Sequence, residues 1–417
     1  MAEAATELLT TADGRPLRSA LAAAQSRAKR RAFLLVLPLL LFVLLTFLIP
    51  IGYMLKRSVE HDGFSASAPA LDAWFTANPG FDPANPPEEA YAALVSDLAR
   101  MQVEKTTGMA GTRINYTVPG TISLFKQGAR EAKDLVAPYK ESLLALDPEW
   151  GKPALWRGMS AASSPYTTEF YQVASDRKLT DDGWARGGDK DRIYLYLFFK
   201  TFLISGLITV ICLLLAFPIS HLLATLPLAR ASLLMILVLL PFWTSLLVRT
   251  TAWIALLQEQ GIVNDTMVGL GLIGDDGRLT MMYNMTGTIV AMTHVLLPFM
   301  ILPLYSVMRV IPPSYARAAR SLGATSWTTF RRVYLPQTLP GIAAGSLLVF
   351  ILAVGYYITP ALVGGADGQL ISNLISFHMS KSNWSLAAAI AGMLLVAILL
   401  LYWLYDRLIG IDRLKLG

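Results

Sequence analysis

The sequence is poor in charged residues and in cysteine. Only 15% of its 417 residues are Asp, Glu, Lys or Arg, whereas a soluble chain carries about a quarter. The single cysteine, Cys212, lies inside an apolar run, so neither an intramolecular disulfide nor a cysteine-rich metal site can form. We interpret it as a small buried hydrophobe. Since 54% of the residues are hydrophobic, part of the chain must lie in a non-aqueous solvent.

The sequence also lacks the motifs of the common enzyme classes. It has no Gly-rich loop ending in Lys-Ser or Lys-Thr, so we expect no bound ATP. It has no His-Glu-x-x-His motif, and its four histidines are scattered. An acidic run of Asp181, Asp182, Asp189 and Asp191 could bind a metal, with a solvated linker as the simpler interpretation. We therefore expect no catalytic residue, metal or cofactor in this chain. A membrane-embedded enzyme, with 57–190 as its working part, is the competing hypothesis.

Six segments are long and apolar enough to cross a bilayer, which takes about 20 residues each. They lie at 32–55, 195–225, 231–257, 286–309, 338–360 and 385–405. All should be helices, because lipid offers the backbone no hydrogen-bond partners. The first follows a basic stretch, as a signal peptide would. It is too long for a signal core and no small-residue cleavage site follows, so we expect it to be retained.

Lysine and arginine are distributed unevenly between the loops. With the N-terminus inside, the two short outside loops carry only Arg278 and Lys381, whereas the inside segments carry more than ten cations. The positive-inside rule then places the tails 1–31 and 409–417 in the cytoplasm. It also explains most of the net charge of +6 without nucleic acid.

The polar stretch 56–192 does not fit a bare bundle. It would lie outside, between the first and second spans. Helix-like runs occur at 88–102 and 121–146, and about 130 residues are enough for a small core. We predict a mainly helical extracytoplasmic insertion, followed by a five-helix core over 193–408.

The segment 311–336 has the pattern of a short helical hairpin between the fourth and fifth spans. Pro312 and Pro313 should end the preceding span. Ser314 can cap a new helix, and Gly323 stands where that helix would end in a left-handed residue. Small residues on such a helix would let a partner protein approach closely.

This segment resembles the EAA loop of binding-protein-dependent ABC importer permeases. The family pattern is Glu-Ala-Ala, three residues, Gly, nine residues, an aliphatic residue, any residue, then Leu-Pro. The residues that match it are Ala318, Ala319, Gly323, Val333, Leu335 and Pro336. Arg317 stands where the family usually has glutamate, which puts one polar contact with the ATPase in doubt.

The resemblance implies an all-α membrane protein with six transmembrane helices of the type I ABC importer (MetI-like) kind, in the bacterial inner membrane. The first helix of the loop would be the coupling helix, seated in a groove of an ATPase. The coupling residues would be Tyr315, Arg317, Ala318, Ala319, Leu322, Gly323, Leu335 and Pro336. The implied partners are two ABC ATPase subunits that hold ATP and Mg, a second permease subunit, a periplasmic solute-binding protein and the lipid bilayer, without nucleic acid.

Two further stretches, 240–253 and 355–365, resemble the third and fifth helices of spermidine/putrescine-type permeases. This resemblance implies a small polar solute, with a polyamine as one candidate. Some polyamine permeases have an acid where Tyr356 or Ala361 stands here, so an opine, an amino acid or another small solute remains the alternative. The insertion would contact the binding protein, by analogy with large outside loops of some maltose-type permeases.

Six residues of the predicted spans are candidates for the solute pathway. They are Trp243, Thr244, Arg249, His294, Tyr356 and Tyr357. Ionisable groups inside a membrane are functional candidates by default. Snorkelling, ordinary packing or anchoring of aromatic side chains at the interface is the alternative for each of them.

Overall fold

The computed structural model describes residues 17–60, 63–188 and 192–409. Asp189 and Asp191 of the acidic run, the first sixteen residues and nearly all of the predicted C-terminal tail lie outside this range. The chain divides into two compact units, 1–57 and 58–417, which are described separately.

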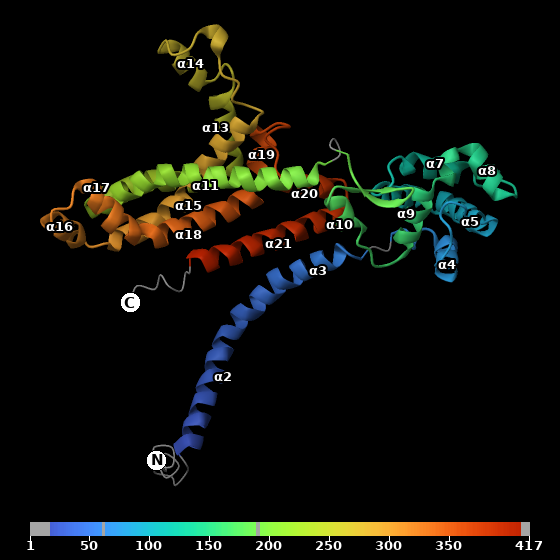
Figure 1. Ribbon diagram of the computed structural model, residues 1–417, viewed down its shortest axis with the longest axis horizontal. Helices are drawn as coiled ribbons and strands as arrows, with labels where there is room; N and C mark the ends of the chain where they lie inside the picture. The colour runs from blue at the N-terminus through green and yellow to red at the C-terminus, as the bar shows by residue number, and fades with distance from the viewer. Residues whose placement is uncertain (1–16, 61–62, 189–191, 410–417) are drawn as a thin grey trace. The chain divides into compact units, whose positions relative to one another are not determined.

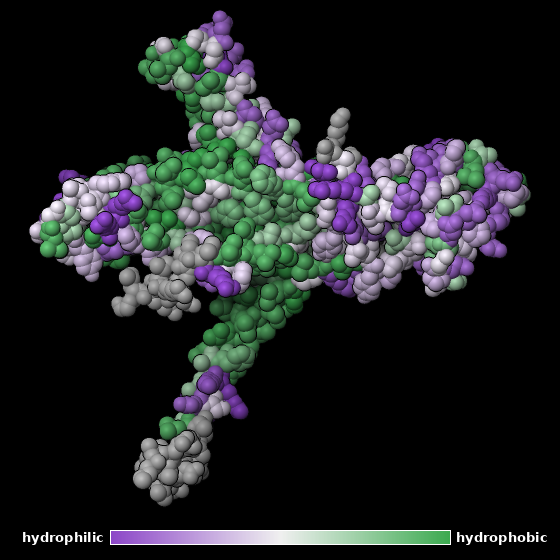
Figure 2. Space-filling model, in the orientation of Figure 1, coloured by the Kyte–Doolittle hydropathy of each residue, from purple (hydrophilic) through white to green (hydrophobic). Residues whose placement is uncertain are grey.

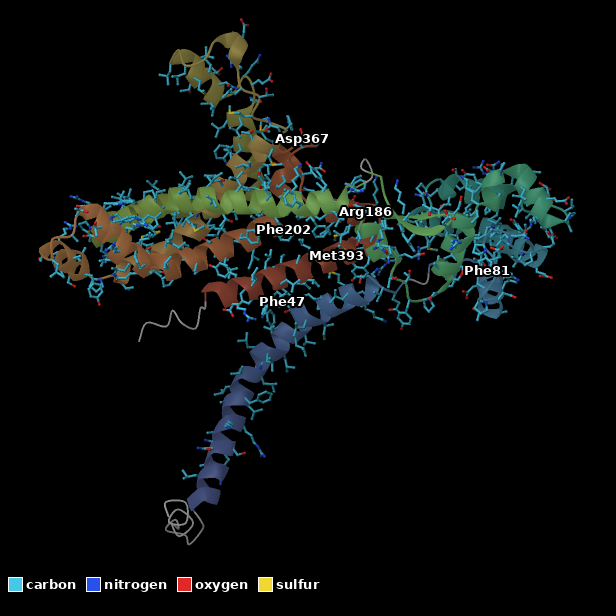
Figure 3. The ribbon with its side chains drawn as sticks, in the orientation of Figure 1. Phe47, Phe81, Arg186, Phe202, Asp367 and Met393 are labelled. Carbon is cyan, nitrogen blue, oxygen red and sulfur yellow. The ribbon has the colours of Figure 1, made fainter. Side chains whose placement is uncertain are left out.

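The first unit is one continuous helix. It consists of α2 (Leu17–Val43), a π-helical turn η1 (Leu44–Leu48) and α3 (Ile49–Arg57). It begins well before the predicted span 32–55, because the preceding Ala-rich and basic residues also favour a helix. Its apolar side chains are exposed, with Leu35 82% and Phe47 56% accessible (Figure 3). Such a surface suits lipid, and the stretch Ala24–Arg57 is long enough to cross a membrane.

Four long helices form the bundle of the second unit. They are α11 (Tyr194–Thr225), α15 (Met285–Val310), α18 (Leu335–Gly355) and α21 (Trp384–Ile409). The central helix α15 packs against both α11 and α18, and α11 runs along the bundle from the insertion toward α17 (Figure 1). Hydrophobic residues cover this part of the surface, whereas the insertion is largely hydrophilic (Figure 2). Each of the four helices contains a stretch that is long and apolar enough to span a bilayer.

The third predicted span is broken. In place of one helix over 231–257, α12 (Leu228–Trp243) is followed by α13 (Leu246–Leu257) and α14 (Ile262–Gly269), with a bend of 99°. The prediction of one uninterrupted helical span here was wrong, because Thr244 is extended and Ser245 caps a new helix, its hydroxyl accepting a bond from Val248 N–H at 3.2 Å. Counting the bent pair as one span gives six spans with the first helix, which confirms the predicted all-α class.

The fifth predicted span, 338–360, is also interrupted. The helix α18 ends at Gly355, and a short helix α19 (Ile358–Val363) follows an extended Tyr356. Beyond it lie α20 (Ile371–Ser380) and α21. The loop between α14 and α15 contains a single 3₁₀ turn, η4 (Asp275–Gly277).

The insertion is built from short helices around an aromatic core. Its helices are α4 (Pro69–Ala77), α5 (Glu88–Glu104), α6 (Thr107–Asn115), α7 (Thr121–Glu131), α8 (Tyr139–Leu146), η2 (Pro148–Gly151), α9 (Pro153–Ser163) and α10 (Glu169–Ala174). The predicted run 121–146 is therefore two helices. A small antiparallel hairpin follows, with strands β1 (Arg177–Thr180) and β2 (Gly183–Arg186). Trp150 and Trp156 are fully buried in the core.

A shared hydrophobic core and a helix cap attach the insertion to the bundle. Phe170 of α10 shares a hydrophobic core with Ile390 of α21. The Asp176 carboxylate accepts bonds from the N–H groups of Tyr194 (2.9 Å) and Leu195 (2.8 Å), and so caps α11 from a distant part of the chain. The insertion is thus joined to one end of α11 and α21, while the loop 311–336 lies at the opposite end of the bundle (Figure 1).

Candidate coupling loop and membrane pathway

The loop 311–336 folds into a short helix followed by a turn and a second helical segment. The helix α16 (Pro313–Ser321) starts with a proline at its first position, where the fixed φ angle favours a helix. Ser314 therefore lies inside the first turn, and the prediction that it caps the helix was wrong. The second segment comprises α17 (Ser326–Thr329) and the π-helical turn η5 (Phe330–Tyr334), which continues directly into α18.

Gly323 ends α16 in the left-handed region, with φ at +87°. Its N–H donates to the carbonyl of Arg320 (2.9 Å), and the N–H of Ala324 donates to that of Ala319 (3.0 Å). This pair of bonds is the Schellman arrangement. Because no other atom lies within 4 Å of a Cβ built at Gly323, the backbone angle alone requires glycine here.

The tip of the loop presents large apolar side chains to its surroundings. Leu322 is 90% exposed, Trp327 67% and Tyr315 53%. Ala318 is exposed beside them, whereas Ala319 is half-buried. Leu335 and Pro336 lie at the start of α18 rather than on α16, so the eight predicted coupling residues form two groups.

The same loop is positively charged throughout. It carries Arg317, Arg320, Arg331 and Arg332 and no aspartate or glutamate. A hollow of about 600 Å³ between α16 and the ends of α11 and α15 is lined by Arg317 and Arg320, among others. Arg309 also borders it and donates to the carbonyls of Ala224 (2.8 Å) and Leu226 (3.1 Å), which holds the end of α15 against the end of α11.

A row of aromatic side chains connects the loop to α11. Trp327 stacks on Phe330 with ring centroids 5.7 Å apart, and Phe330 stacks on Tyr334 at 6.2 Å. The Tyr334 hydroxyl lies 2.9 Å from Nδ1 of His221 on α11. Sequence reasoning missed Tyr334 and His221, although the spacing of residues 327, 330 and 334 is that of one helix face.

The six pathway candidates fall into separate groups. The Arg249 guanidinium bonds to the carbonyls of Pro241 and Thr244 and to the Thr244 hydroxyl, which lies 3.4 Å from Nε. These carbonyls lose their helical hydrogen-bond donors at the break between α12 and α13, and Arg249 supplies donors in their place. Trp243 is 70% exposed beside it.

His294 pairs with a residue that sequence reasoning did not single out. The Trp253 Nε1–H donates to His294 Nδ1 at 3.2 Å, and the two rings lie 5.2 Å apart. This contact joins α13 to α15. Tyr356 and Tyr357 act through their backbone carbonyls, which accept bonds from Ser372 Oγ (2.7 Å) and Asn373 Nδ2 (2.8 Å) of α20. The Tyr357 side chain is 44% exposed.

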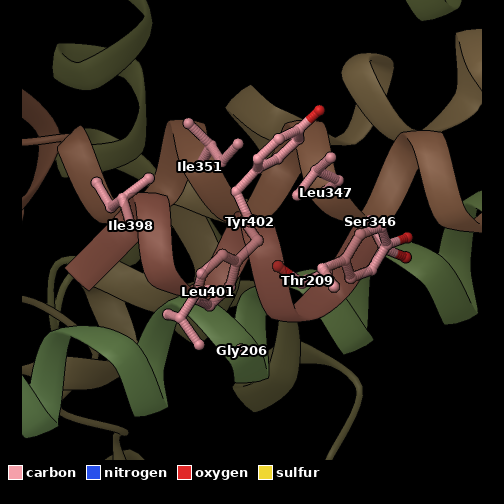
Figure 4. A pocket seen from close by; sticks show the side chains of 10 residues that line it. Gly206, Thr209, Ser346, Leu347, Ile351, Ile398, Leu401 and Tyr402 are labelled. Atoms are coloured by element: carbon pink, nitrogen blue, oxygen red, sulfur yellow. The ribbon is translucent and has the colours of Figure 1, made fainter. Parts of the chain in front are cut away.

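A second hollow, of about 280 Å³, lies between α11, α18 and α21 (Figure 4). None of the pathway candidates lines it. Its lining residues are Gly206, Thr209, Ser346, Leu347, Phe350, Ile351, Ile398, Leu401, Tyr402 and Tyr405. The surface is almost entirely apolar, and the Tyr405 hydroxyl is already bonded to the Ala343 carbonyl at 2.6 Å, so this hollow suits hydrocarbon rather than a polar solute.

Among the described residues, no group of three or more His, Cys, Asp or Glu side chains could hold a metal ion. The part of the acidic run that is described does structural work, since Asp181 accepts a bond from the N–H of Ala154 at 3.1 Å, at the start of α9.

The model of a family described as "binding-protein-dependent transport system inner membrane component" matches residues 191–409, a range that contains the bundle and the loop 311–336. The chain belongs to this family. It is therefore a multi-pass membrane protein and the permease subunit of a binding-protein-dependent importer, as predicted. The match leaves out nearly all of the insertion.

Curated relatives of this permease include spermidine/putrescine transport system permease proteins PotB. The protein from Haemophilus influenzae is 36% identical over 216 residues, covering 52% of this chain and 75% of the relative. The protein from Escherichia coli K12 is 34% identical over 224 residues, covering 53% and 81%. A crystal structure of a bacterial alginate ABC transporter in complex with alginate pentasaccharide-bound periplasmic protein contains a chain that is 18% identical. It covers 54% of this permease and 80% of that chain, with a TM-score of 0.46.

Proposed function

We propose that this permease works in the bacterial inner membrane with two ATPase subunits, a second permease subunit and a periplasmic solute-binding protein. ATP and Mg would be held by the ATPases, and both termini would lie in the cytoplasm with 56–192 in the periplasm. The solute would be a small cation of the polyamine class. The support for this class is the identity of 34–36% to the PotB proteins.

The exposed tip of α16 is the observation that supports ATPase coupling best. Leu322, at 90% exposure, would fill an apolar pocket of the ATPase, and Tyr315 and Trp327 would flank it. Burial of one such leucine side chain contributes about 1.5–3 kcal/mol. Since η5 runs directly into α18 and Tyr334 contacts His221 of α11, a push on the loop would move two spans together.

The charge of the loop defines the chemistry of its partner. Four arginines without a carboxylate favour an acidic groove on the ATPase, because opposite potentials steer association and select the partner. Arg317 would bind a carboxylate in a two-pronged contact. The family's usual glutamate at this position would need a basic counterpart, so the ATPase of this permease should differ from others at that contact.

The coupling proposal is tested by reversing charge on α16. Arg317→Glu/Arg320→Glu should abolish co-purification of the ATPase and ATP-dependent uptake, and Leu322→Ala should weaken both. Arg130→Glu/Lys126→Glu on the exposed face of α7 makes the same charge change and is the matched control for co-purification of the ATPase, which it should leave unchanged. Unchanged ATPase binding by the α16 double variant would refute the proposal.

The solute class is tested separately in proteoliposomes containing the whole transporter. We expect uptake of spermidine that saturates and that unlabelled putrescine reduces. Of the six pathway candidates, Trp243 and Tyr357 have exposed aromatic rings and would contact the solute, because aromatic faces attract cations. Uptake of an amino acid or opine without uptake of spermidine would overturn the polyamine assignment and leave the permease role intact.

The insertion is proposed to dock the binding protein. The insertion is attached to α11 through Asp176 and to α21 through Phe170. This supports a role in which docking of the binding protein moves these two spans. Cys212 is buried, so Lys126→Cys can be labelled selectively with a bulky maleimide polymer. We expect weaker association of the binding protein after labelling, and a deletion of 65–185 that left this affinity and uptake unchanged would rule docking out.

A further inference from the structure

Two arginines stand directly opposite each other at the open end of the β1–β2 hairpin. Arg177 pairs with Arg186 in the antiparallel register, and both side chains are exposed. Like charges in this position destabilise a strand pair. Within the described part of the chain, Arg177 donates to Gln172 Oε1 at 3.1 Å and neither arginine has an ion pair. The two positive charges therefore lack a counter-ion among the residues that the structure describes.

A hollow of about 470 Å³ lies over this pair. Its lining consists of Ser175, Arg177, Trp184, Arg186 and Leu195. Alternation along the strands puts Trp184 on the same face of the hairpin as both arginines. The hollow thus combines two guanidinium groups with an indole ring and an aliphatic side chain.

The hairpin lies where a transmembrane helix begins (Figure 3, Arg186). Asp176, next to Arg177 in the chain, caps α11 through the N–H groups of Tyr194 and Leu195. Leu195 belongs to the first turn of α11 and also lines the hollow. Around it, Ile193 is 52% and Tyr196 59% exposed. Tyrosine and tryptophan at the end of a span are typical of the membrane–water interface.

We propose that this hollow binds the phosphate of an anionic membrane phospholipid. Each guanidinium has a planar fork of donors that matches phosphate oxygens. A phosphate between Arg177 and Arg186 would replace their repulsion with a bridge. The glycerol and upper acyl chain would lie against Trp184 and Leu195. The exposed apolar side chains at the start of α11 favour a lipid over an acidic protein surface, since a protein surface would leave them without hydrocarbon contact.

The site would anchor the foot of the insertion to the bilayer. The hairpin contacts α9 and α10, and α10 packs against α21. A lipid held at the hairpin would therefore fix the insertion relative to the membrane plane as well as to the two spans. This role depends only on the chain being a membrane protein and not on the transported solute.

The test is a titration of the full-length chain in detergent with phosphatidylglycerol, followed by native mass spectrometry. We expect Arg177→Gln/Arg186→Gln to bind the first lipid roughly tenfold more weakly, because each lost charge-assisted bond is worth more than a neutral one. The control Lys126→Gln/Arg130→Gln removes the same charge from α7 and should bind like the parent chain. Arg177→Lys/Arg186→Lys keeps the charge but loses the forks, so it should bind with intermediate affinity.

Several outcomes would overturn the site. Equal affinity of the lysine variant and the parent chain would do so even if the glutamine variant failed to fold. Displacement of phosphatidylglycerol by inorganic phosphate at millimolar concentration would show a site for free phosphate rather than lipid. Loss of binding-protein affinity in the glutamine variant, with lipid binding unchanged, would make the hairpin a protein contact.

Discussion

Trp150 and Trp156 are fully buried in the insertion, whereas Trp243 of α12 and Trp403 of α21, in the membrane region, are 70% and 56% exposed. Between its helices the bundle buries small and hydroxyl-bearing residues together with aliphatic and methionine side chains, but no tryptophan among the described residues. Examples of the small and hydroxyl-bearing residues are Ala216, Ala353, Ser205, Ser220 and Thr201. Both regions are helical, so the difference reflects the solvent around them. Water drives large apolar side chains inward. Moving an apolar side chain from lipid to the protein interior gives no such gain in free energy. Helices in a membrane associate instead through close approach of their backbones.

We expect the largest effect from a substitution in the aromatic core of the insertion. Trp156 lies 4.8 Å from the Tyr91 ring and donates to the Trp150 carbonyl at 2.8 Å. Trp156→Ala should lower the free energy of unfolding of the insertion by about 3–5 kcal/mol, measured by hydrogen exchange in α5 and α9 of the full chain. Trp403→Ala, on the exposed side of α21, should change it by less than about 0.5 kcal/mol. Equal effects would contradict the comparison.

The ion pair between Arg113 and Glu169 lies near the junction of the two regions. Mutating it tests how completely water is excluded there. The distance is 2.7 Å, and the side chains are 1% and 4% exposed. Glu169→Ala should cost about 3–5 kcal/mol, because it leaves a buried charge unpaired, and amides of α6 and α10 should lose protection. The double variant Arg113→Met/Glu169→Leu should recover most of this loss. A double variant as unstable as the single one would show that the charges themselves are required.

The bundle should be sensitive to added volume where its helices touch. A Cβ built at Gly341 of α18 would lie 3.1 Å from the Pro303 carbonyl oxygen and 3.2 Å from Leu304 Cα, both of α15. Gly341→Leu should therefore destabilise the bundle by about 1–3 kcal/mol, seen as a lower melting temperature in nanodiscs. Gly206→Leu is the control, since no atom lies within 4 Å of its built Cβ. A smaller effect at Gly341 than at Gly206 would disprove close packing of these helices.

The smallest effect concerns a carboxyl in the insertion. Asp97 accepts bonds from the N–H groups of Leu71 (2.7 Å) and Ala70 (3.2 Å), yet burial raises its pKa above the ordinary value of 3.8. The folded state thus holds this proton more tightly than the unfolded state does. The resulting stability is fully present below pH 3.8 and is lost as the pH rises through the raised pKa.

Asp97→Asn should flatten this pH dependence, because the amide does not titrate. The measurement is hydrogen exchange of α4 and α5 in the full chain, between acidic and neutral pH. Asp82→Asn, in an exposed loop, is the control and should leave the profile unchanged. A profile for Asp97→Asn that matched the parent chain would assign the pH dependence to another group.

Sequence reasoning predicted the spans well and their breaks poorly. An apolar run of sufficient length identifies a span because the bilayer imposes that length. The run does not reveal that the helix breaks at Thr244. The nearby Pro241 gives no reliable signal of a break, because proline is tolerated within a membrane helix. Arg249 was selected as an intramembrane cation, but its bonds to the carbonyls at the break depend on a fold that its position in the run does not specify.

In the loop 311–336 too, local features were predictable from the sequence and long-range contacts were not. Gly323 was predicted to end a helix, and it does so with a positive φ, since this requirement is local. The contacts of Tyr334 with His221 and of His294 with Trp253 join residues more than forty positions apart. Pattern reasoning had no signal for these partners.

The sequence by itself determined the membrane class, the approximate spans and the helical hairpin at 311–336, because hydropathy, helix termination and residue spacing act within a few turns of chain. Only the tertiary structure decided how the insertion is held, which carbonyls Arg249 satisfies and that Arg177 faces Arg186. The physical reason is that these features arise from pairs of groups that meet only after the chain has folded. The energy of each pair also depends on whether folding removed its groups from water or from lipid.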